Sequence, residues 1–103
     1  MYSIIFITAS KVDEAEKIAK GLLESKLAAC INIISQVKSY FWWEGKIDQA
    51  DELLLIVKTR KSLVNKLIKK VKSLHSYSVP EIVAFPIISG NKDYLRWIDD
   101  STK

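Results

Sequence analysis

The sequence predicts an α+β fold whose strands and helices follow one another in the order β-α-β-β-α-β-α. Two short aliphatic runs, Tyr2 to Ala9 and Leu53 to Thr59, are typical of strands buried on both faces. Two other segments carry apolar residues at helical spacing, and a long alternating segment begins near Ala28 between them. With 103 residues the chain is long enough for one compact domain, residues 1–103, and too short for two ordinary ones.

The first helix is expected from Lys11 to Ser25. Ser10 followed by Asp13 has the spacing of a capping box, which opens many helices. The apolar residues that recur at helical spacing are Ala15, Ile18, Ala19, Leu22 and Leu23.

A long β-hairpin is expected next, with Glu44-Gly45 as its turn and Lys46 to Thr59 as its returning strand. A strand of about 15 residues at ~3.3 Å each is near 50 Å long, whereas a domain of this size is only ~35 Å across. The end of the hairpin should therefore project. Alternation places Ala29, Ile31, Ile33, Val37, Phe41 and Trp43 on one face, and Cys30, Asn32, Gln36, Lys38 and Tyr40 largely on the other.

The second helix ends near His75 and is followed by a connection over residues 76–80. Glu81 to Ile88 reads as a fourth strand, and Pro86 assigns it to a sheet edge or a bulge because proline has no amide donor. Asn91 is a suitable cap for a last helix. The apolar stripe of the second helix is Leu63, Val64, Leu67, Ile68, Val71 and Leu74, and the last helix carries Tyr94, Leu95, Trp97 and Ile98.

This order is the β-α-β-β-α-β unit of ferredoxin-like folds, with a long hairpin between the second and third strands and an extra C-terminal helix. Right-handed crossovers would place both main helices on one face of the sheet. Because the first and third strands are apolar on both faces, the other face needs the last helix, another subunit or water. We therefore expect an obligate oligomer, whose interface includes the hairpin aromatics Tyr40, Phe41, Trp42 and Trp43.

The composition bears on the cellular location of the protein and on the partners that it can bind. The one cysteine, Cys30, cannot form an intrachain disulfide, so we expect a reducing, cytoplasmic location. The apolar stretch from Tyr2 to Thr8 is far too short to cross a membrane, so no membrane partner is expected. Lysines between residues 58 and 72 could contact phosphates. However, the first and third strands carry aliphatic residues where an RNA-recognition motif has stacking aromatics, so we expect a solvated face and no nucleic-acid partner.

No catalytic motif is present. The sequence has no serine-histidine-acid order, no zinc-binding histidine-glutamate motif and no glycine-rich phosphate loop, and it contains only three glycines. We therefore predict that the protein is not an enzyme.

Three side chains are candidate metal ligands. His75 is the one imidazole of the chain, Cys30 is a soft donor for copper or mercury, and Glu81 could supply a carboxylate. Each of the first two has a simpler interpretation: His75 as a favourable cation at a helix C-terminus, and Cys30 as a small buried side chain.

Five ordered segments resemble the CutA family of divalent-ion tolerance proteins and together cover nearly the whole chain. They are Lys26 to Asn32, the hairpin tip from Ser39 to Lys46, Glu52 to Thr59, His75 to Ile82, and Tyr94 to Trp97. The resemblance implies a ferredoxin-like homotrimer, cytosolic in microbes, that is implicated in tolerance of copper and other divalent cations and has no established enzymatic reaction.

The sequence departs from the family pattern near the histidine. Ser76 and Ser78 stand where the family has a proline and usually an acidic or polar residue, and Ile7 and Leu74 occupy two positions that carry metal ligands in some members. Only His75 matches those positions. In a trimer, three copies of Cys30 or of His75 could pool their donors around the axis.

The function predicted on this basis is a trimeric protein of divalent metal (copper) tolerance, binding or sensing. The alternative is a small-ligand signalling trimer with clefts between its subunits. In that case Lys58, Tyr77 and Trp97, together with Glu81, are the polar or amphipathic groups that could line the cleft.

Overall fold

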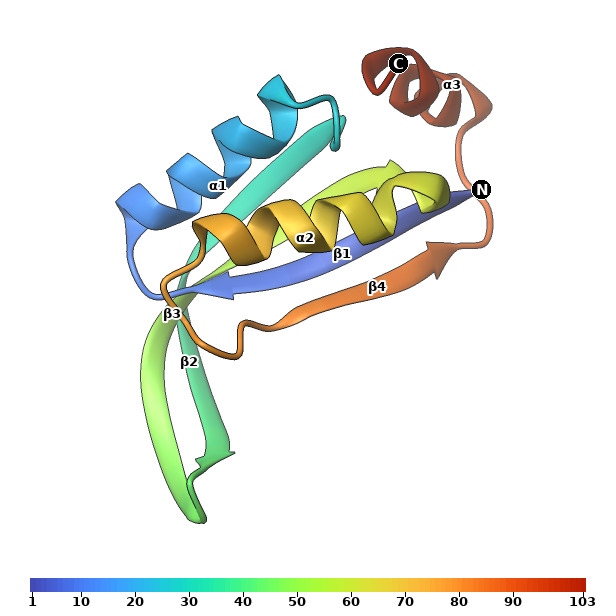
Figure 1. The fold of residues 1–103 in the computed structure, drawn as a ribbon. Helices are drawn as coiled ribbons and strands as arrows, with labels where there is room; N and C mark the ends of the chain where they lie inside the picture. Colours follow the sequence, from blue (N-terminus) through green and yellow to red (C-terminus); the bar gives the residue numbers. More distant parts are fainter.

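In a computed structural model, which describes all of residues 1–103, a four-stranded antiparallel sheet carries two helices on one face and a third at one end (Figure 1). The strand order across the sheet is β2-β3-β1-β4. The elements are β1 (Tyr2–Ala9), α1 (Val12–Glu24), β2 (Cys30–Trp43), β3 (Lys46–Arg60), the short 3₁₀ turn η1 (Lys61–Leu63), α2 (Val64–Leu74), β4 (Ile82–Ile87) and α3 (Lys92–Ser101). The predicted order and the ferredoxin-like topology are confirmed.

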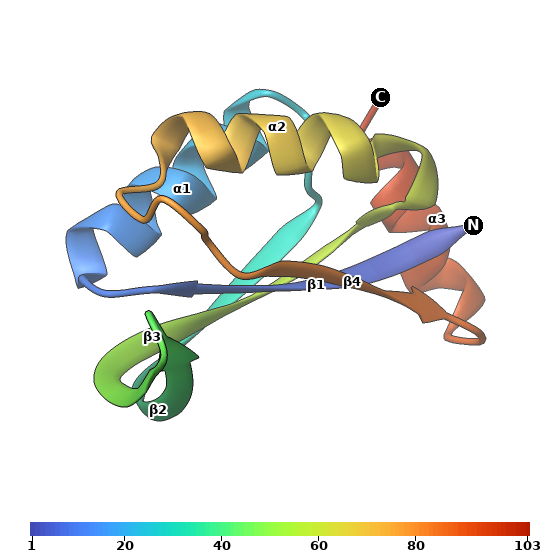
Figure 2. The ribbon, with the colours of Figure 1, turned by 60° about the horizontal axis from the view of Figure 1, so that its bottom comes forward.

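Helices α1 and α2 lie side by side on the same face of the sheet, as Figure 2 shows. Their apolar stripes meet the alternate residues of the two central strands, and this layer is the core. The residues that are fully shielded from solvent include Ile5, Ile7, Leu55 and Val57 from the sheet, and Ile18, Leu22, Leu67 and Val71 from the helices.

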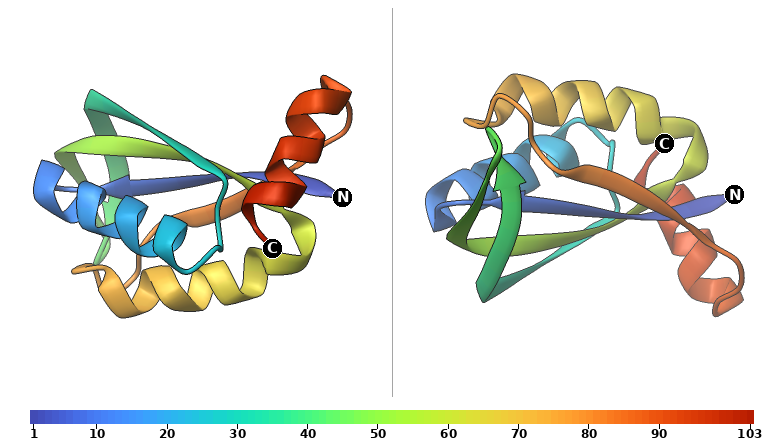
Figure 3. Two further views of the ribbon diagram at one scale, coloured as in Figure 1. Left: turned by 90° about the horizontal axis from the view of Figure 1, so that it is seen from above. Right: turned by 90° about the horizontal axis from the view of Figure 1, so that it is seen from below.

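The opposite face of the sheet is also apolar but is covered only at one end, where α3 lies (Figure 3). We call it the open face. Helix α3 is held there through the Tyr2 hydroxyl, which donates to Asp99 at 2.6 Å, and through Arg60, which donates to Thr102. Away from α3 the cover is incomplete, because Val83 and Phe85 of β4 are 43% and 46% exposed. The other apolar side chains of this face are Ile4, Phe6, Leu54 and Ile56, all of them half-buried.

The β2–β3 hairpin extends well beyond the helix-covered part of the sheet (Figure 1). Its strands have 14 and 15 residues, and the molecule is 44 Å long on its longest axis. Glu44 and Gly45 form the predicted turn with φ angles of 50° and 79°, as the mirror-image turns of tight hairpins require. The prediction that the hairpin projects is confirmed.

The distribution of side chains along β2 differs from strict alternation. A bulge between Ile34 and Val37, with Gln36 at a φ of 62°, inserts one extra residue into β2. Beyond it the register places Phe41 opposite Asp48 and Trp43 opposite Lys46, which continue the open face. The expectation that Phe41 and Trp43 share a face with Ile31 and Ile33 is therefore wrong, because one extra residue exchanges the two faces of a strand.

The helix caps give one correction and one confirmation. Helix α1 has Lys11 as its N-cap, without a side-chain hydrogen bond, so Ser10 and Asp13 do not form the expected capping box. The helix begins one residue later than that box requires. Asn91 does cap α3, because its Oδ1 accepts a hydrogen bond from the Asp93 amide at 2.9 Å. Pro86 lies in the edge strand β4, as expected.

Candidate functional site

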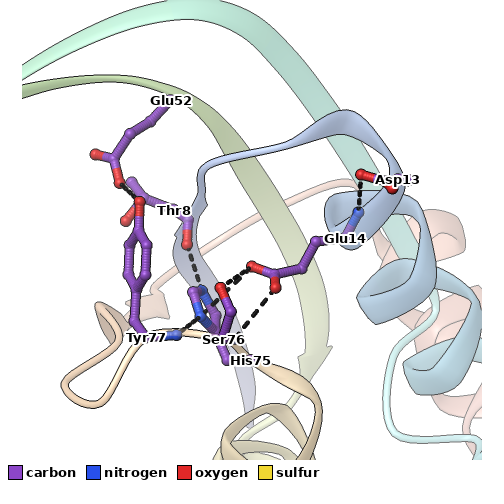
Figure 4. A network of polar contacts seen from close by, with 7 residues as sticks. All are labelled: Thr8, Asp13, Glu14, Glu52, His75, Ser76 and Tyr77. Carbon is purple, nitrogen blue, oxygen red and sulfur yellow. Dashed lines mark hydrogen bonds and ion pairs between the residues drawn. The ribbon is translucent and has the colours of Figure 1, made fainter.

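The one imidazole of the chain lies at the centre of a partly buried polar network (Figure 4). His75 follows the last residue of α2, and its side chain is fully shielded from solvent. Its Nδ1 accepts a hydrogen bond from the Tyr77 amide at 3.1 Å, and its Nε2 lies 2.7 Å from the Thr8 carbonyl oxygen. Because a backbone amide can only donate, Nδ1 is unprotonated and Nε2–H is the donor to Thr8.

Glu14 of α1 joins this network from the other side. Its carboxylate accepts hydrogen bonds from the amide and the hydroxyl of Ser76, both at 3.1 Å, and lies 3.6 Å from Nδ1 of His75. The contacts tie the connection after α2 to the first turn of α1. Ser76, which departs from the family pattern, therefore has a defined structural partner.

Tyr77 links the same connection to the root of the hairpin. Its hydroxyl donates to Oε2 of Glu52 at 2.7 Å, and Glu52 is only 7% exposed (Figure 4). Burial raises the pKa of the Tyr77 hydroxyl to about 12, and the hydrogen bond to Glu52 adds to the rise. The hydroxyl thus stays a donor over the whole range in which most proteins are folded.

A second cluster lies on the open face at the end that α3 covers. Lys58 of β3 donates to Asn32 Oδ1 and has its Nζ 3.8 Å from the Cys30 sulfur. Tyr94 of α3 lies against the same thiol, and burial together with Cys30 raises the pKa of its hydroxyl. Trp97 packs on Tyr94 with ring centroids 5.4 Å apart. This cluster joins two of the predicted cleft residues, Lys58 and Trp97.

The predicted cleft residue Tyr77 does not join them within one chain. Lys58 and Cys30 are level with Ile4 of β1, whereas the His75 network contacts Thr8, four residues further along that strand. A cleft that includes all three side chains would need a neighbouring chain.

The candidate metal ligands are also apart. His75 and Cys30 belong to the two separate clusters just described, and Glu81 is an exposed residue directly before β4. No group of three or more histidine, cysteine, aspartate or glutamate side chains is arranged to hold a metal ion. Both ring nitrogens of His75 are already engaged, so ligation through this residue would cost one of those hydrogen bonds.

The hairpin aromatics are the most exposed apolar group of the sheet. Tyr40 and Trp42 are 67% and 73% exposed, and Phe41 and Trp43 are about half as exposed as Trp42. Ile47, opposite Trp42 on β3, is similarly open. Their role as an interface stays a prediction.

Three polar partners were missed from the sequence: Glu14, Glu52 and Asn32. A signal existed for Glu52, because a carboxylate directly before the aliphatic run of β3 enters a buried strand and must then find a donor. Glu14 and Asn32 gave no signal, since their partners, Ser76 and Lys58, are 62 and 26 residues away in the chain.

Comparisons with known proteins agree over the whole chain. The chain is 52% identical over 103 residues to the divalent-cation tolerance protein CutA of Archaeoglobus fulgidus, with all of both chains covered. The solved structures of the Archaeoglobus fulgidus protein and of Cut A1 from Thermus thermophilus both match with a TM-score of 0.97 and complete coverage, at 51% and 45% identity. The chloroplastic protein CutA 1 of rice is 42% identical over 97% of this chain, which covers 56% of the rice protein.

The expectation of a cytoplasmic location is overturned by these relatives. The Archaeoglobus fulgidus structure is described as that of a periplasmic protein, and the rice and Arabidopsis thaliana relatives are chloroplastic. A chain with one cysteine has no intrachain disulfide in any compartment, so its cysteine count does not distinguish between compartments. No helix of the protein is long and apolar enough to span a membrane.

Family profiles give the same assignment as the pairwise matches. Residues 3–101 match the family described as CutA1 divalent ion tolerance protein. With the ferredoxin-like sheet, the long hairpin and the added C-terminal helix all present, the chain belongs to the CutA family of divalent-cation tolerance proteins.

Proposed function

We propose that this protein acts in divalent-cation tolerance as a homotrimer that binds or senses a divalent cation, copper being the first candidate. The observation that carries the proposal is the uncovered apolar surface made by the open face and the hairpin. Membership of the divalent-cation tolerance family supports a role for a divalent cation. The resemblance of the five sequence segments to that family supports three subunits.

The accessible area supports association. One chain exposes 6896 Å², whereas a folded monomer of this mass typically exposes roughly 5,900 Å². The excess of about 1,000 Å² is comparable with the area that one subunit buries in a standard interface, ~800 Å². Because Phe41 and Trp43 lie on the open face beyond the bulge, the sheet and the hairpin present one continuous surface to a neighbour.

Metal binding in this proposal uses donors from more than one chain, because the donors of one chain are apart. Cys30 is the stronger candidate for a soft cation, since it is partly exposed on the open face and three copies could meet across an interface. His75 would have to exchange its bond to Thr8 or to Tyr77 for the metal, and Glu81 is free to contribute a carboxylate.

The proposal is tested by two measurements on the same samples. Light scattering coupled to size exclusion should give a mass of three chains, and Phe85→Asp, which puts a charge on the open face, should shift it toward one. Calorimetric titration with Cu²⁺ should show binding that weakens in Cys30→Ser, His75→Ala or Glu81→Gln. A stable monomer at micromolar concentration would contradict the assembly, and unchanged titrations in all three variants would remove these residues from the site.

The second candidate is a signalling trimer with small-ligand clefts between its subunits. It is favoured by the presence of Lys58 and Trp97 in the same cluster on the open face. A cleft completed by Tyr77 of a neighbouring chain would offer an ammonium group, a hydroxyl and an aromatic face to an anionic metabolite. A thermal-shift screen separates the candidates, because a ligand that binds only the folded state raises its melting point. Stabilisation by Cu²⁺ alone supports the metal, and stabilisation by an anionic metabolite alone supports the cleft.

A further inference from the structure

The outer face of α2 is basic, has no acidic side chains beside its lysines, and makes no packing contact with the rest of the protein. Between residues 61 and 74 the chain has five lysines and no acid. Lys66, Lys69 and Lys72 recur every third residue, are exposed, and lie on the side of α2 that faces away from the buried Leu67 and Val71. We call these three side chains the lysine row. Figure 2 shows that the helix carrying them forms an outer surface of the molecule.

Nothing within the chain neutralises this row. The one ion pair of the protein is Lys103 with Asp100, and the only other carboxylate close to a basic side chain is that of Glu14 beside His75, so no carboxylate oxygen lies within 4.0 Å of an α2 lysine. Lys70, by contrast, points toward α1 and lines a groove of about 510 Å³ that also contains Asp13, Glu16 and Glu24. The like charges of the row stand one helical turn apart and repel each other, an arrangement that an anionic partner would relieve.

The distribution of charge over α1 and α2 favours binding of a narrow, linear polyanion over binding of a flat anionic surface. Helix α1 lies beside α2 on the same face and carries four acids and only two lysines. A planar anionic surface such as a membrane would meet both helices, and so both signs of charge. A linear polyanion laid along α2 would meet only the lysine row, which covers about 9 Å of helix, the axial length of roughly three phosphates of one strand of a duplex.

The chemistry of the face favours phosphates over a protein or single-stranded bases. None of the large exposed apolar side chains of the protein belongs to η1 or α2. A protein interface needs apolar or aromatic anchors, and single-stranded nucleic acids are held by stacking on aromatic rings. Binding to the backbone of a duplex needs neither, because counterion release supplies essentially all of the affinity. The sequence-based expectation of no nucleic-acid partner rested on the lack of stacking aromatics in the sheet, which argues against base recognition but does not bear on contacts to a duplex backbone.

We propose that the lysine row of α2 is a docking surface for the phosphate backbone of double-stranded nucleic acid, bound without sequence preference. The surface lies on the helical side of the sheet, opposite the open face, so it stays available whether or not the chains associate as proposed. Three rows on one assembly would bind a long duplex more tightly than one row by raising the effective concentration.

The test is fluorescence anisotropy with a labelled DNA duplex of mixed sequence, about three helical turns long, over a range of salt of roughly 50 to 200 mM. The variant Lys66→Gln/Lys69→Gln/Lys72→Gln is compared with a control of equal charge change, Lys11→Gln/Lys92→Gln/Lys103→Gln. If one row contacts three phosphates, the slope of log K against log salt is steeper by roughly 2.7 in the wild type than in the α2 variant. Across this salt range the wild type should therefore lose roughly 40-fold more affinity than the variant. The control should keep most of the wild-type slope.

Other outcomes overturn the proposal. Equal losses in the two triple variants would show that net charge alone is responsible. Tighter binding of the matching single strand would indicate base stacking, and tighter binding of phosphatidylglycerol vesicles at equal phosphate concentration would indicate a membrane. Circular dichroism of the α2 variant should show unchanged helix content, since all three side chains are exposed, so loss of binding there reports on the surface and not on the fold.

Discussion

Replacement of Tyr77 by phenylalanine tests the network that joins the connection after α2 to the root of the hairpin. The change removes one hydroxyl and leaves Oε2 of the buried Glu52 without its 2.7 Å donor. A hydrogen bond to a carboxylate contributes about 1.5–3 kcal/mol to stability, and a buried acceptor left without a partner costs a similar amount. We expect Tyr77→Phe to lower the free energy of unfolding by about 2 kcal/mol at pH 7.

The same residue predicts how stability depends on pH. The hydroxyl keeps its proton to a pKa of about 12 in the folded protein, whereas it ionises near pH 10 in the unfolded chain. The folded state therefore binds the proton more tightly, so the stabilisation is complete below pH 10 and is lost as the pH rises toward 12. In Tyr77→Phe this alkaline loss should be smaller than in the wild type; the remainder comes from tyrosines such as Tyr2, whose pKa is also raised by its bond to Asp99.

The assay is unfolding in guanidinium chloride at one fixed protein concentration, because association would make stability depend on concentration. The matched control is Ser78→Ala, which removes an exposed hydroxyl from the same connection and should change stability by less than about 0.5 kcal/mol. Equal stability of the two variants at pH 7, or retention of the full alkaline loss in Tyr77→Phe, would contradict a stabilising hydrogen bond between Tyr77 and Glu52.

Three further substitutions test the fold at separate places, each by chemical denaturation. Asn91→Ala removes the cap of α3 and should cost about 1 kcal/mol; no loss would mean that the Asp93 amide finds another acceptor. Leu67→Ala leaves a cavity in the core, where the side chain is fully buried, and should cost about 2–5 kcal/mol, so a loss below about 1 kcal/mol would contradict the packing described. Gly45→Ala forces a non-glycine residue to a φ of 79° at the hairpin turn and should cost about 1–2 kcal/mol, although no atom lies within 4 Å of the added methyl group. An unchanged midpoint there would indicate a different turn.

The predicted metal ligands show where sequence reasoning reached its limit. His75 and Cys30 follow from the sequence as the scarce donor types of the chain, but their separation into two clusters depends on strand register. Likewise, both ring nitrogens of His75 form hydrogen bonds, one with Thr8 and one with Tyr77, and the bond to Thr8 joins β1 to the connection after α2. No local pattern encodes such contacts, because the partners are brought together only by the folded sheet.

The spacing of apolar residues and a few turn and cap residues are enough to predict much of the secondary structure. Apolar spacing specified both long helices and the two-faced apolar strands, Glu44-Gly45 specified the turn, and Asn91 specified the last cap. These features are local, since each depends on residues within a turn or a strand of one another.

Which side chains share a surface depends on how the folded segments pair and pack. One extra residue at the β2 bulge moved Phe41 and Trp43 to the open face, where they adjoin the uncovered sheet. Packing of α1 and α2 on one side left that face to α3 alone, and the folded sheet brought the buried Glu52 to Tyr77. The physical reason is that register and burial are properties of pairs of segments, and a difference of one residue in either segment exchanges the buried and the exposed sets.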